Sequence, residues 1–500
     1  MLENSHVEPR AVADEAAAPR PAAPRPAAAR ARLAGAALRR HWLAAALLAA
    51  GLVLRVLAQF AYRPVLFYID TTRYLYNDAP GMDPVGYKGP LRAILAVANF
   101  NAVAAVQHLL GLAMAAGIYV LLLRRGCPRW LAALAMAPLL LDAYQIQIEQ
   151  TVMPDTWFEA LILTGLAILL WRPAPGWRAV LAGGLVLGTS ATFAQVGEAL
   201  LLPAVLYLLV LGGGWRRALR RAAALGAAFV LPILTYSTVN YLAAGDFFLS
   251  HAGVTSAYGR MAAAADCATL RLPPAERNMC PTRAQQALGP DFLEFGLLSP
   301  IRPYYDGLAR DHTDGLITDF NHRVLTQQPL RVLRAYLRDV VRPFALTRDG
   351  SPGVTAISRW QFQAAYPYFP PHASRHVVDA SADRFGGGRP AVWAPVAGFL
   401  RGYQLHGGYT PGPLFALCAL AGLAGSASLL VRRRAGPAAR GAALACLLLF
   451  TSAASLLLVS DVFEFSWRYL LPALVTLVPA GALGIGVIIR SAGHAAAAAD

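Results

Sequence analysis

Long apolar segments alternate with short polar connectors along most of this chain of 500 residues. An α-helix needs about 20 apolar residues to cross a lipid bilayer. We expect such helices at residues 42–61, 101–123, 130–148, 157–171, 179–195, 198–211, 222–244, 412–431, 441–460 and 469–489. The fourth and sixth segments are short, so we expect them to be tilted, broken or shielded by neighbours. The pattern predicts an all-α polytopic membrane protein with about ten transmembrane helices.

The polar stretches divide the chain into further regions. The first residues are mainly Ala, Pro, Arg and Glu, which cannot bury enough apolar surface to offset the entropy of ordering the chain. The stretch between the seventh and eighth helices is too long to be a plain loop, so we expect it to have structure of its own. The predicted regions are a disordered cytoplasmic tail (1–38), an N-terminal transmembrane catalytic module (39–244) with its first outer loop (62–100), a structured extracytoplasmic segment (245–411), the C-terminal transmembrane helices (412–490) and a second cytoplasmic tail (491–500).

The composition supports a membrane location. Charged residues make up 14% of the chain, against about 25% in soluble domains. The net charge of +16 does not indicate a nucleic-acid partner, because many arginines lie in short connectors, where they set membrane orientation. With ten helices, six basic clusters fall on one side: Arg39/Arg40, Arg124/Arg125/Arg129, Arg172/Arg178, residues 215–221, Arg432/Arg433/Arg434/Arg440 and Arg490. The positive-inside rule makes that side cytoplasmic, so both termini are expected there in a multi-pass inner-membrane protein.

The predicted extracytoplasmic segment carries its own signals. Residues 315–344 have apolar side chains at helical spacing, and Pro329 is expected to divide them into two helices. Residues 345–411 are rich in Gly, Pro and aromatic residues and are expected to be extended chain. Cys267 and Cys280 lie 13 residues apart in this segment, and an oxidising compartment favours a disulfide between them. The cysteine spacing shows no zinc-binding pattern.

Asp70 is the first candidate catalytic residue. It follows the first apolar segment directly, in the sequence FYIDTTRYL. A carboxylate at a membrane boundary with apolar neighbours can act as a general base. The alternative is a solvated loop aspartate, which is the commoner case.

Two further carboxylates lie in the next outer connector. Asp155 precedes an apolar run and is either a second acidic group of a site or a helix N-cap. Glu149 is either a second acid near the pocket or a group that solvates a helix end. Carboxylates so close to lipid are costly unless they face water or a site.

Basic residues on the predicted outer side are candidates for binding a phosphate. Lys88 is the one lysine of the chain and is flanked by glycines, while Arg73 follows Asp70 and Arg468 precedes the last helix. Cations here suit a phosphate-bearing lipid headgroup. The alternatives are anchoring to anionic lipid and, for Arg468 with Asp461 and Glu464, a local salt bridge.

These motifs together resemble a known superfamily. The acidic first outer loop (YIDTTRYL), its return through GYKGPLRAIL, the second acidic connector (EQTVMPDTWF) and WRYLLP before the last helix are similar to the GT-C membrane glycosyltransferases. These enzymes use polyprenyl-phosphate sugars, and the protein O-mannosyltransferases and the lipid A aminoarabinose transferase are relatives. The resemblance covers residues 42–240 well and the C-terminal helices loosely. Many members carry an Asp-Glu pair where this chain has Asp70 and Thr71.

The resemblance implies a mechanism. A sugar, mannose or arabinofuranose, passes with inversion from a polyprenyl-phosphate donor to an envelope glycan, lipid or protein acceptor. Asp70 is the base, and Lys88, Arg73 and Arg468 bind the donor phosphate. No cofactor is expected to be required, although a divalent metal is possible, and no nucleotide motif is found. The alternative function is a multi-pass transporter or lipid flippase. Such a protein is predicted to show internal sequence repeats and polar residues at mid-membrane. A non-catalytic scaffold is the third possibility.

Overall fold

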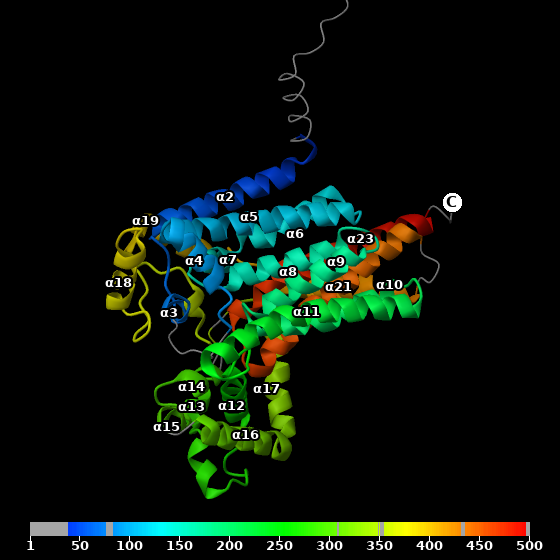
Figure 1. Ribbon diagram of the computed structural model, residues 1–500. Helices are drawn as coiled ribbons and strands as arrows, with labels where there is room; N and C mark the ends of the chain where they lie inside the picture. Colours follow the sequence, from blue (N-terminus) through cyan, green and yellow to red (C-terminus); the bar gives the residue numbers. More distant parts are fainter. Residues whose placement is uncertain are drawn as a thin grey trace, which may run out of the picture.

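The computed structural model describes residues 39–76, 84–307, 310–348, 350, 355–431 and 436–496. The predicted tail at 1–38 lies outside the described residues, and so does the end of the predicted C-terminal tail. The described part is predominantly helical, with one two-stranded sheet. Its chain forms an apolar helical bundle and a smaller helical unit beside one end of it (Figure 1).

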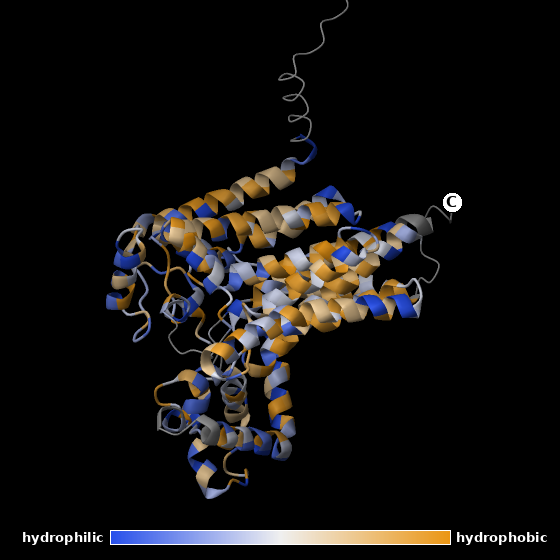
Figure 2. Cartoon of the chain, viewed as in Figure 1, coloured by the Kyte–Doolittle hydropathy of each residue, from blue (hydrophilic) through white to orange (hydrophobic). Residues whose placement is uncertain are grey.

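Every segment that was expected to span the membrane is helical. In Figure 2 the bundle is mainly hydrophobic, and several of its helix ends are hydrophilic. Its elements are α2 (Trp42–Ala61), α5 (Phe100–Arg124), α6 (Arg129–Leu141), α7 (Ala143–Glu149), α8 (Asp155–Leu170), α9 (Trp177–Ala191), η1 (Gln195–Leu200), α10 (Leu201–Leu211), α11 (Trp215–Ala244), α20 (Gly412–Val431), α21 (Pro437–Phe463), η5 (Trp467–Leu470), α22 (Pro472–Val475) and α23 (Leu477–Ala496).

Five described helices are long and apolar enough to cross a membrane: α2, α5, α11, α20 and α21. Two bent pairs raise this number to seven: α6 with α7, bent by 56°, and the η5–α22 segment with α23, bent by 43°. Asp142 lies at the first bend, where its side chain accepts a hydrogen bond from the backbone N–H of Tyr144 and starts α7. The prediction of an all-α membrane protein is confirmed, while the number of ten spans stays a prediction.

Glycines allow two helix pairs of the bundle to approach closely. α9 packs on α11, and a Cβ at Gly188 would overlap the backbone carbonyl of Phe229. α20 packs on α23, and a Cβ at Gly484 would overlap the carbonyl of Ala421. Small residues are the usual means by which membrane helices gain packing contacts, because lipid supplies no hydrophobic drive for their association.

The smaller unit is built from the first part of the predicted extracytoplasmic segment. It has its own core around Tyr258 and Phe320. Pro329 begins a new helix, as predicted, and a disulfide joins Cys267 to Cys280, the pair that the sequence analysis expects. The elements are α12 (Ala252–Ala264), η2 (Pro274–Met279), α13 (Arg283–Ala287), α14 (Pro290–Phe295), α15 (Arg302–Gly307), α16 (Arg310–Gln327) and α17 (Pro329–Val341).

The prediction of extended chain over residues 345–411 is wrong. After η3 (Arg342–Phe344), this stretch contains η4 (Ile357–Trp360), α18 (Arg375–Phe385), β2 (Ala391–Val392) and α19 (Ala394–Leu405). β2 pairs antiparallel with β1 (Tyr62–Arg63), and α19 packs on α2. The helices form because residues such as Ala397 and Leu400 are buried against the bundle, so tertiary contacts outweigh a Gly- and Pro-rich local sequence.

Candidate functional site

Backbone pairing brings the two acidic connectors together. Beyond β1, the N–H of Leu66 donates to the carbonyl of Gln150 (2.8 Å), and the N–H of Val152 donates back to the carbonyl of Leu66 (3.0 Å). The hydroxyl of Thr71 also donates to the carbonyl of Val152 (3.1 Å). The loop that carries Asp70 is therefore fixed against the segment that leads into α8.

Four charged side chains meet at this junction, and we call Asp70, Arg73, Asp155 and Arg468 the Asp70 site. Asp70 immediately precedes α3 (Thr71–Tyr76), and Asp155 is the first residue of α8. Arg468 holds Asp155 through two hydrogen bonds, from Nε to Oδ1 (2.6 Å) and from Nη2 to Oδ2 (2.9 Å). Its Nη1 lies 3.7 Å from Oδ2 of Asp70, whose Oδ1 lies 3.5 Å from Nη2 of Arg73.

The two carboxylates of the site are not equivalent. Both oxygens of Asp155 are held by one guanidinium in the bidentate geometry that makes such pairs strong. The contacts of Asp70 are longer, and its side chain remains 20% exposed. Asp70 thus has acceptor positions open to a bound molecule. Asp155 does not serve as an N-cap of α8, since the cap residue is Pro154 and no side-chain cap bond forms there.

Aromatic rings from distant segments cover one side of the site. The Tyr68 ring lies 4.6 Å from that of Trp360 and 5.1 Å from that of Phe369. The Arg468 guanidinium lies 5.3 Å from the centre of the Trp360 ring. Arg359 donates to the Tyr68 hydroxyl (3.3 Å), so η4 and the loop before Asp70 are linked by polar and aromatic contacts. Aromatic rings that carry polar atoms at one edge offer an apolar surface beside charge to a bound molecule.

Glu464 adds a titratable group beside the Asp70 site. Its carboxylate accepts hydrogen bonds from the hydroxyls of Tyr469 (2.9 Å) and Thr355 (3.3 Å). Burial, reinforced by the negative charge of Asp291, raises the pKa of Glu464 to about 7. Asp291 is itself paired with Arg359, through oxygen–nitrogen distances of 3.0 and 3.1 Å. A carboxyl group that titrates near neutrality can exchange a proton under physiological conditions.

Glu149 lies in a different environment. Its side chain is fully buried and pairs with Nη2 of Arg55 (2.7 Å) and with Nδ1 of His108 (2.9 Å). The other ring nitrogen of His108 lies 2.8 Å from Oε1 of Gln150. We call Arg55, His108, Glu149 and Gln150 the Arg55 network. Glu149 therefore joins α2 and α5 to α7 inside the bundle, and the ion pairs of the Asp70 site do not include it.

Lys88 lies at the beginning of α4 (Lys88–Val97) and is half-buried. The preceding residue, Tyr87, is fully buried, and its ring meets that of Tyr74 from α3 at 5.3 Å. The backbone N–H of Gly86 donates to the carbonyl of Thr192 (2.8 Å). Of the three predicted phosphate-binding residues, Arg73 and Arg468 lie beside Asp70, and Lys88 lies where the loop returns to the bundle.

The sequence analysis does not single out several residues around the Asp70 site and in the Arg55 network. Arg359, Trp360 and Asp291 come from a long segment without a recognisable motif, so no sequence signal marked them. Arg55 did carry a signal, because an arginine inside an apolar span is rare and needs a partner. Within the described ranges, no group of three or more His, Cys, Asp or Glu side chains is arranged to hold a metal ion.

Comparisons with known proteins return little. No protein-family model matches the chain, and no curated protein matches it. Among solved structures, the chain is similar to the archaeal oligosaccharyltransferase AglB from Archaeoglobus fulgidus, in complex with an inhibitory peptide and a dolichol-phosphate, at 14% sequence identity and a TM-score of 0.41. The alignment covers 91% of this chain and 51% of that one, so the chain spans about half the length of that protein.

Proposed function

We propose that this chain is an integral membrane glycosyltransferase that moves a sugar from a polyprenyl-phosphate donor to a cell-envelope acceptor on the extracytoplasmic face. The observation that carries the proposal is the Asp70 site. It combines a partly exposed carboxylate with two arginines at the end of an apolar bundle. A phosphate-linked lipid donor has its apolar chain in the membrane and its anionic headgroup at such a boundary.

The geometry supports a role for Asp70 as the base. Its carboxylate has longer ionic contacts than Asp155 and keeps exposed surface. An acceptor hydroxyl bound there transfers its proton to Asp70 as its oxygen bonds to the anomeric carbon. The bond from that carbon to the phosphate oxygen breaks at the same time, on the opposite side, and the sugar configuration inverts.

The arginines support the departure of the lipid phosphate. This group gains negative charge as the glycosidic bond breaks, so cations fixed beside it stabilise the transition state more than the ground state. Arg468 is pre-oriented for this role by its two bonds to Asp155. Arg73 lies on the other side of the Asp70 carboxylate, and we assign Lys88 a supporting role at the same phosphate.

We propose mannose or arabinofuranose as the transferred sugar. Mannose and arabinofuranose donors are the first to test, with envelope glycan, lipid and protein fractions as acceptors. We place both termini in the cytoplasm and the Asp70 site outside, because the arginine-rich connectors lie at the other ends of the helices.

The experiment measures transfer of radiolabelled sugar from these donors in membranes that contain the wild-type chain or Asp70→Asn. Loss of a general base lowers such rates by about 10²- to 10⁴-fold, so we expect at least a hundredfold loss at equal expression. The control is Asp379→Asn on α18, where the carboxylate forms an exposed i,i+4 pair with Arg375. Equal transfer by wild type and Asp70→Asn would make Asp70 structural and would move the assignment to Asp155, since Glu149 is sealed inside the bundle.

A transporter or flippase is the second candidate, because the Arg55 network places ionisable groups inside the bundle. Buried ionisable groups inside membrane helices often mark substrate or proton pathways. Here, however, Arg55 is held by the carbonyls of Gly51, Leu139 and Leu140 as well as by Glu149, an arrangement typical of a static structural pair. Lipid flipping or uptake in reconstituted vesicles, without transfer from any donor, would support this function over the enzyme.

A further inference from the structure

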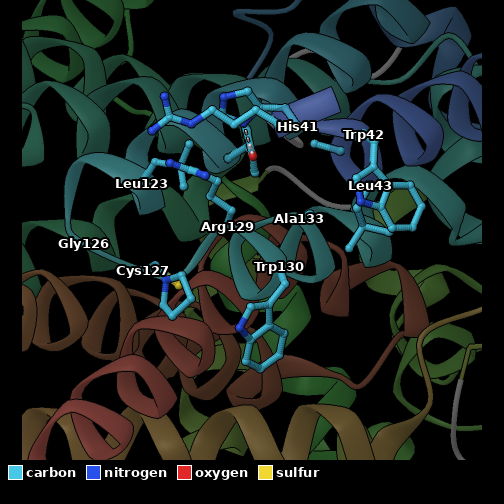
Figure 3. A pocket seen from close by; sticks show the side chains of 13 residues that line it. His41, Trp42, Leu43, Leu123, Gly126, Cys127, Arg129, Trp130 and Ala133 are labelled. Carbon is cyan, nitrogen blue, oxygen red and sulfur yellow. Dashed lines mark hydrogen bonds between the residues drawn. The ribbon is translucent and has the colours of Figure 1, made fainter. Parts of the chain in front are cut away.

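A cavity of about 980 Å³ lies at the far end of the bundle from the Asp70 site. Asp70 follows the last turn of α2, whereas the cavity lies at its first turn, beside Trp42. The beginning of α6 and the end of α5 form its other walls (Figure 3). Its volume is at the upper end of the range of about 300–1,000 Å³ that ligand sites occupy. The proposed glycosyl transfer makes no use of this cavity.

The polar lining of the cavity is cationic. Arg40 and Arg129 line it, and among the described residues no acidic side chain does. Nδ1 of His41 lies 2.7 Å from the hydroxyl of Tyr119, which adds a polar pair between the beginning of α2 and α5. The ion pairs of the described residues include neither arginine. A group of this kind is suited to an anion.

Two helices add to the positive potential. α2 begins at Trp42 and α6 at Arg129, so both N-termini lie at the cavity. In these two helices no side chain caps the N-terminus, and the first turn contains no acidic residue. The N-terminal end of a helix carries a partial positive charge and attracts anions, phosphates in particular.

The rim of the cavity is typical of a membrane interface. Trp42 and Trp130 lie at its edge and are 65% and 52% exposed. Figure 3 shows both indole rings at the cavity with Arg129 and His41. Tryptophan concentrates at the headgroup level of a bilayer. Apolar side chains, among them Leu43 and Leu123, continue from the cavity along the helices.

We propose that this cavity binds the phosphate headgroup of an anionic membrane lipid, with the acyl chains along the α2–α6 surface. The apolar walls and the tryptophan rim suit a lipid rather than a soluble phosphate. The chain's own first 38 residues are a weaker match for the cavity than an anionic lipid, because their five arginines outnumber their four acidic residues. By the arginine distribution, this lipid belongs to the cytoplasmic leaflet.

The first experiment is native mass spectrometry of the delipidated full-length protein with phosphatidylglycerol or phosphatidylcholine of identical acyl chains. The wild type is expected to retain phosphatidylglycerol preferentially. The double variant Arg40→Gln/Arg129→Gln is expected to bind it about thirtyfold more weakly, because each interfacial cation adds to the attraction. The matched control, Arg178→Gln/Arg220→Gln, removes two arginines from the same predicted side but outside the cavity and should bind as the wild type does.

The proposal is overturned if the double variant retains phosphatidylglycerol like the wild type, or if both lipids bind equally to the wild type. Displacement of the lipid by millimolar glycerol 1-phosphate would identify a soluble ligand instead. A photo-cross-linker at Ala133 tests the location. A lipid adduct is expected, whereas an adduct with residues 1–38 or with a second copy of the chain would assign the cavity to that occupant and overturn the proposal.

Discussion

Asp155 and Glu149 come from one connector, yet the fold gives them opposite environments. Asp155 is paired with Arg468 at a partly exposed junction, next to a carboxylate with acceptor positions available. Glu149 is paired with Arg55 and His108 where neither Glu149 nor Arg55 has more than 1% of its side chain exposed. An ion pair that is sealed off can hold helices together but cannot reach a substrate. An ion pair at the boundary is accessible to a bound molecule, which the proposed sugar transfer requires.

Breaking the Arg55 network should have the largest effect on folding. Glu149→Gln leaves the Arg55 guanidinium buried without its counter-charge, and loss of one partner of a buried pair costs about 3–5 kcal/mol. We expect a large fall in the free energy of unfolding and in expression, measured by denaturation in mixed micelles. The control is Asp266→Asn, because the Asp266–Arg331 pair has 36% and 53% of its side chains exposed and should contribute about 0–1 kcal/mol. Equal stability of both variants would show that the buried pair contributes little.

Replacing the Arg468 guanidinium by an ammonium group should reduce sugar transfer more than it reduces the amount of folded protein. Arg468→Lys keeps the positive charge but cannot hold both oxygens of Asp155 at once. We expect a stability loss of about 1.5–3 kcal/mol, the usual contribution of hydrogen bonds to charged groups. The rate of sugar transfer should fall by a larger factor than the amount of folded protein. Steady-state transfer and thermal unfolding of the same preparation measure both. Unchanged transfer would show that the orientation of the guanidinium is not part of the mechanism.

Glu464 should produce a smaller effect that depends on pH. Its folded-state pKa is about 7, above the ordinary value of 4.5, so the folded protein retains a proton that the unfolded chain has released. The stability that this group contributes is complete below about pH 4.5, falls as the pH rises, and is lost above about pH 7. In Glu464→Gln, melting temperatures at pH 5 and pH 8 should differ less than in the wild type. The control is Asp379→Asn, whose melting temperature should depend on pH as that of the wild type does. If the melting temperature of Glu464→Gln also keeps the wild-type pH dependence, Glu464 is not its source.

The sequence by itself determined the membrane class, the location of the apolar helical segments and the break at Pro329, but not the bends between α6 and α7 and before α23. These properties depend on the apolar content and periodicity of contiguous residues, which a linear pattern records directly. It also named Asp70, Arg73, Asp155 and Arg468 as separate candidates, because charge near a membrane boundary is costly wherever it occurs.

Only the tertiary structure decided which of these candidates meet. The backbone pairing of Leu66 with Gln150 and Val152 brings two connectors together, and η5 adds Arg468 from a segment 313 residues beyond Asp155. The tertiary structure also buries Glu149 against Arg55 and folds residues 375–405 into two helices that pack on the bundle. Such outcomes depend on contacts between distant segments, whose energies are set by burial and by the partners available there. The local sequence of each segment records neither this burial nor these partners.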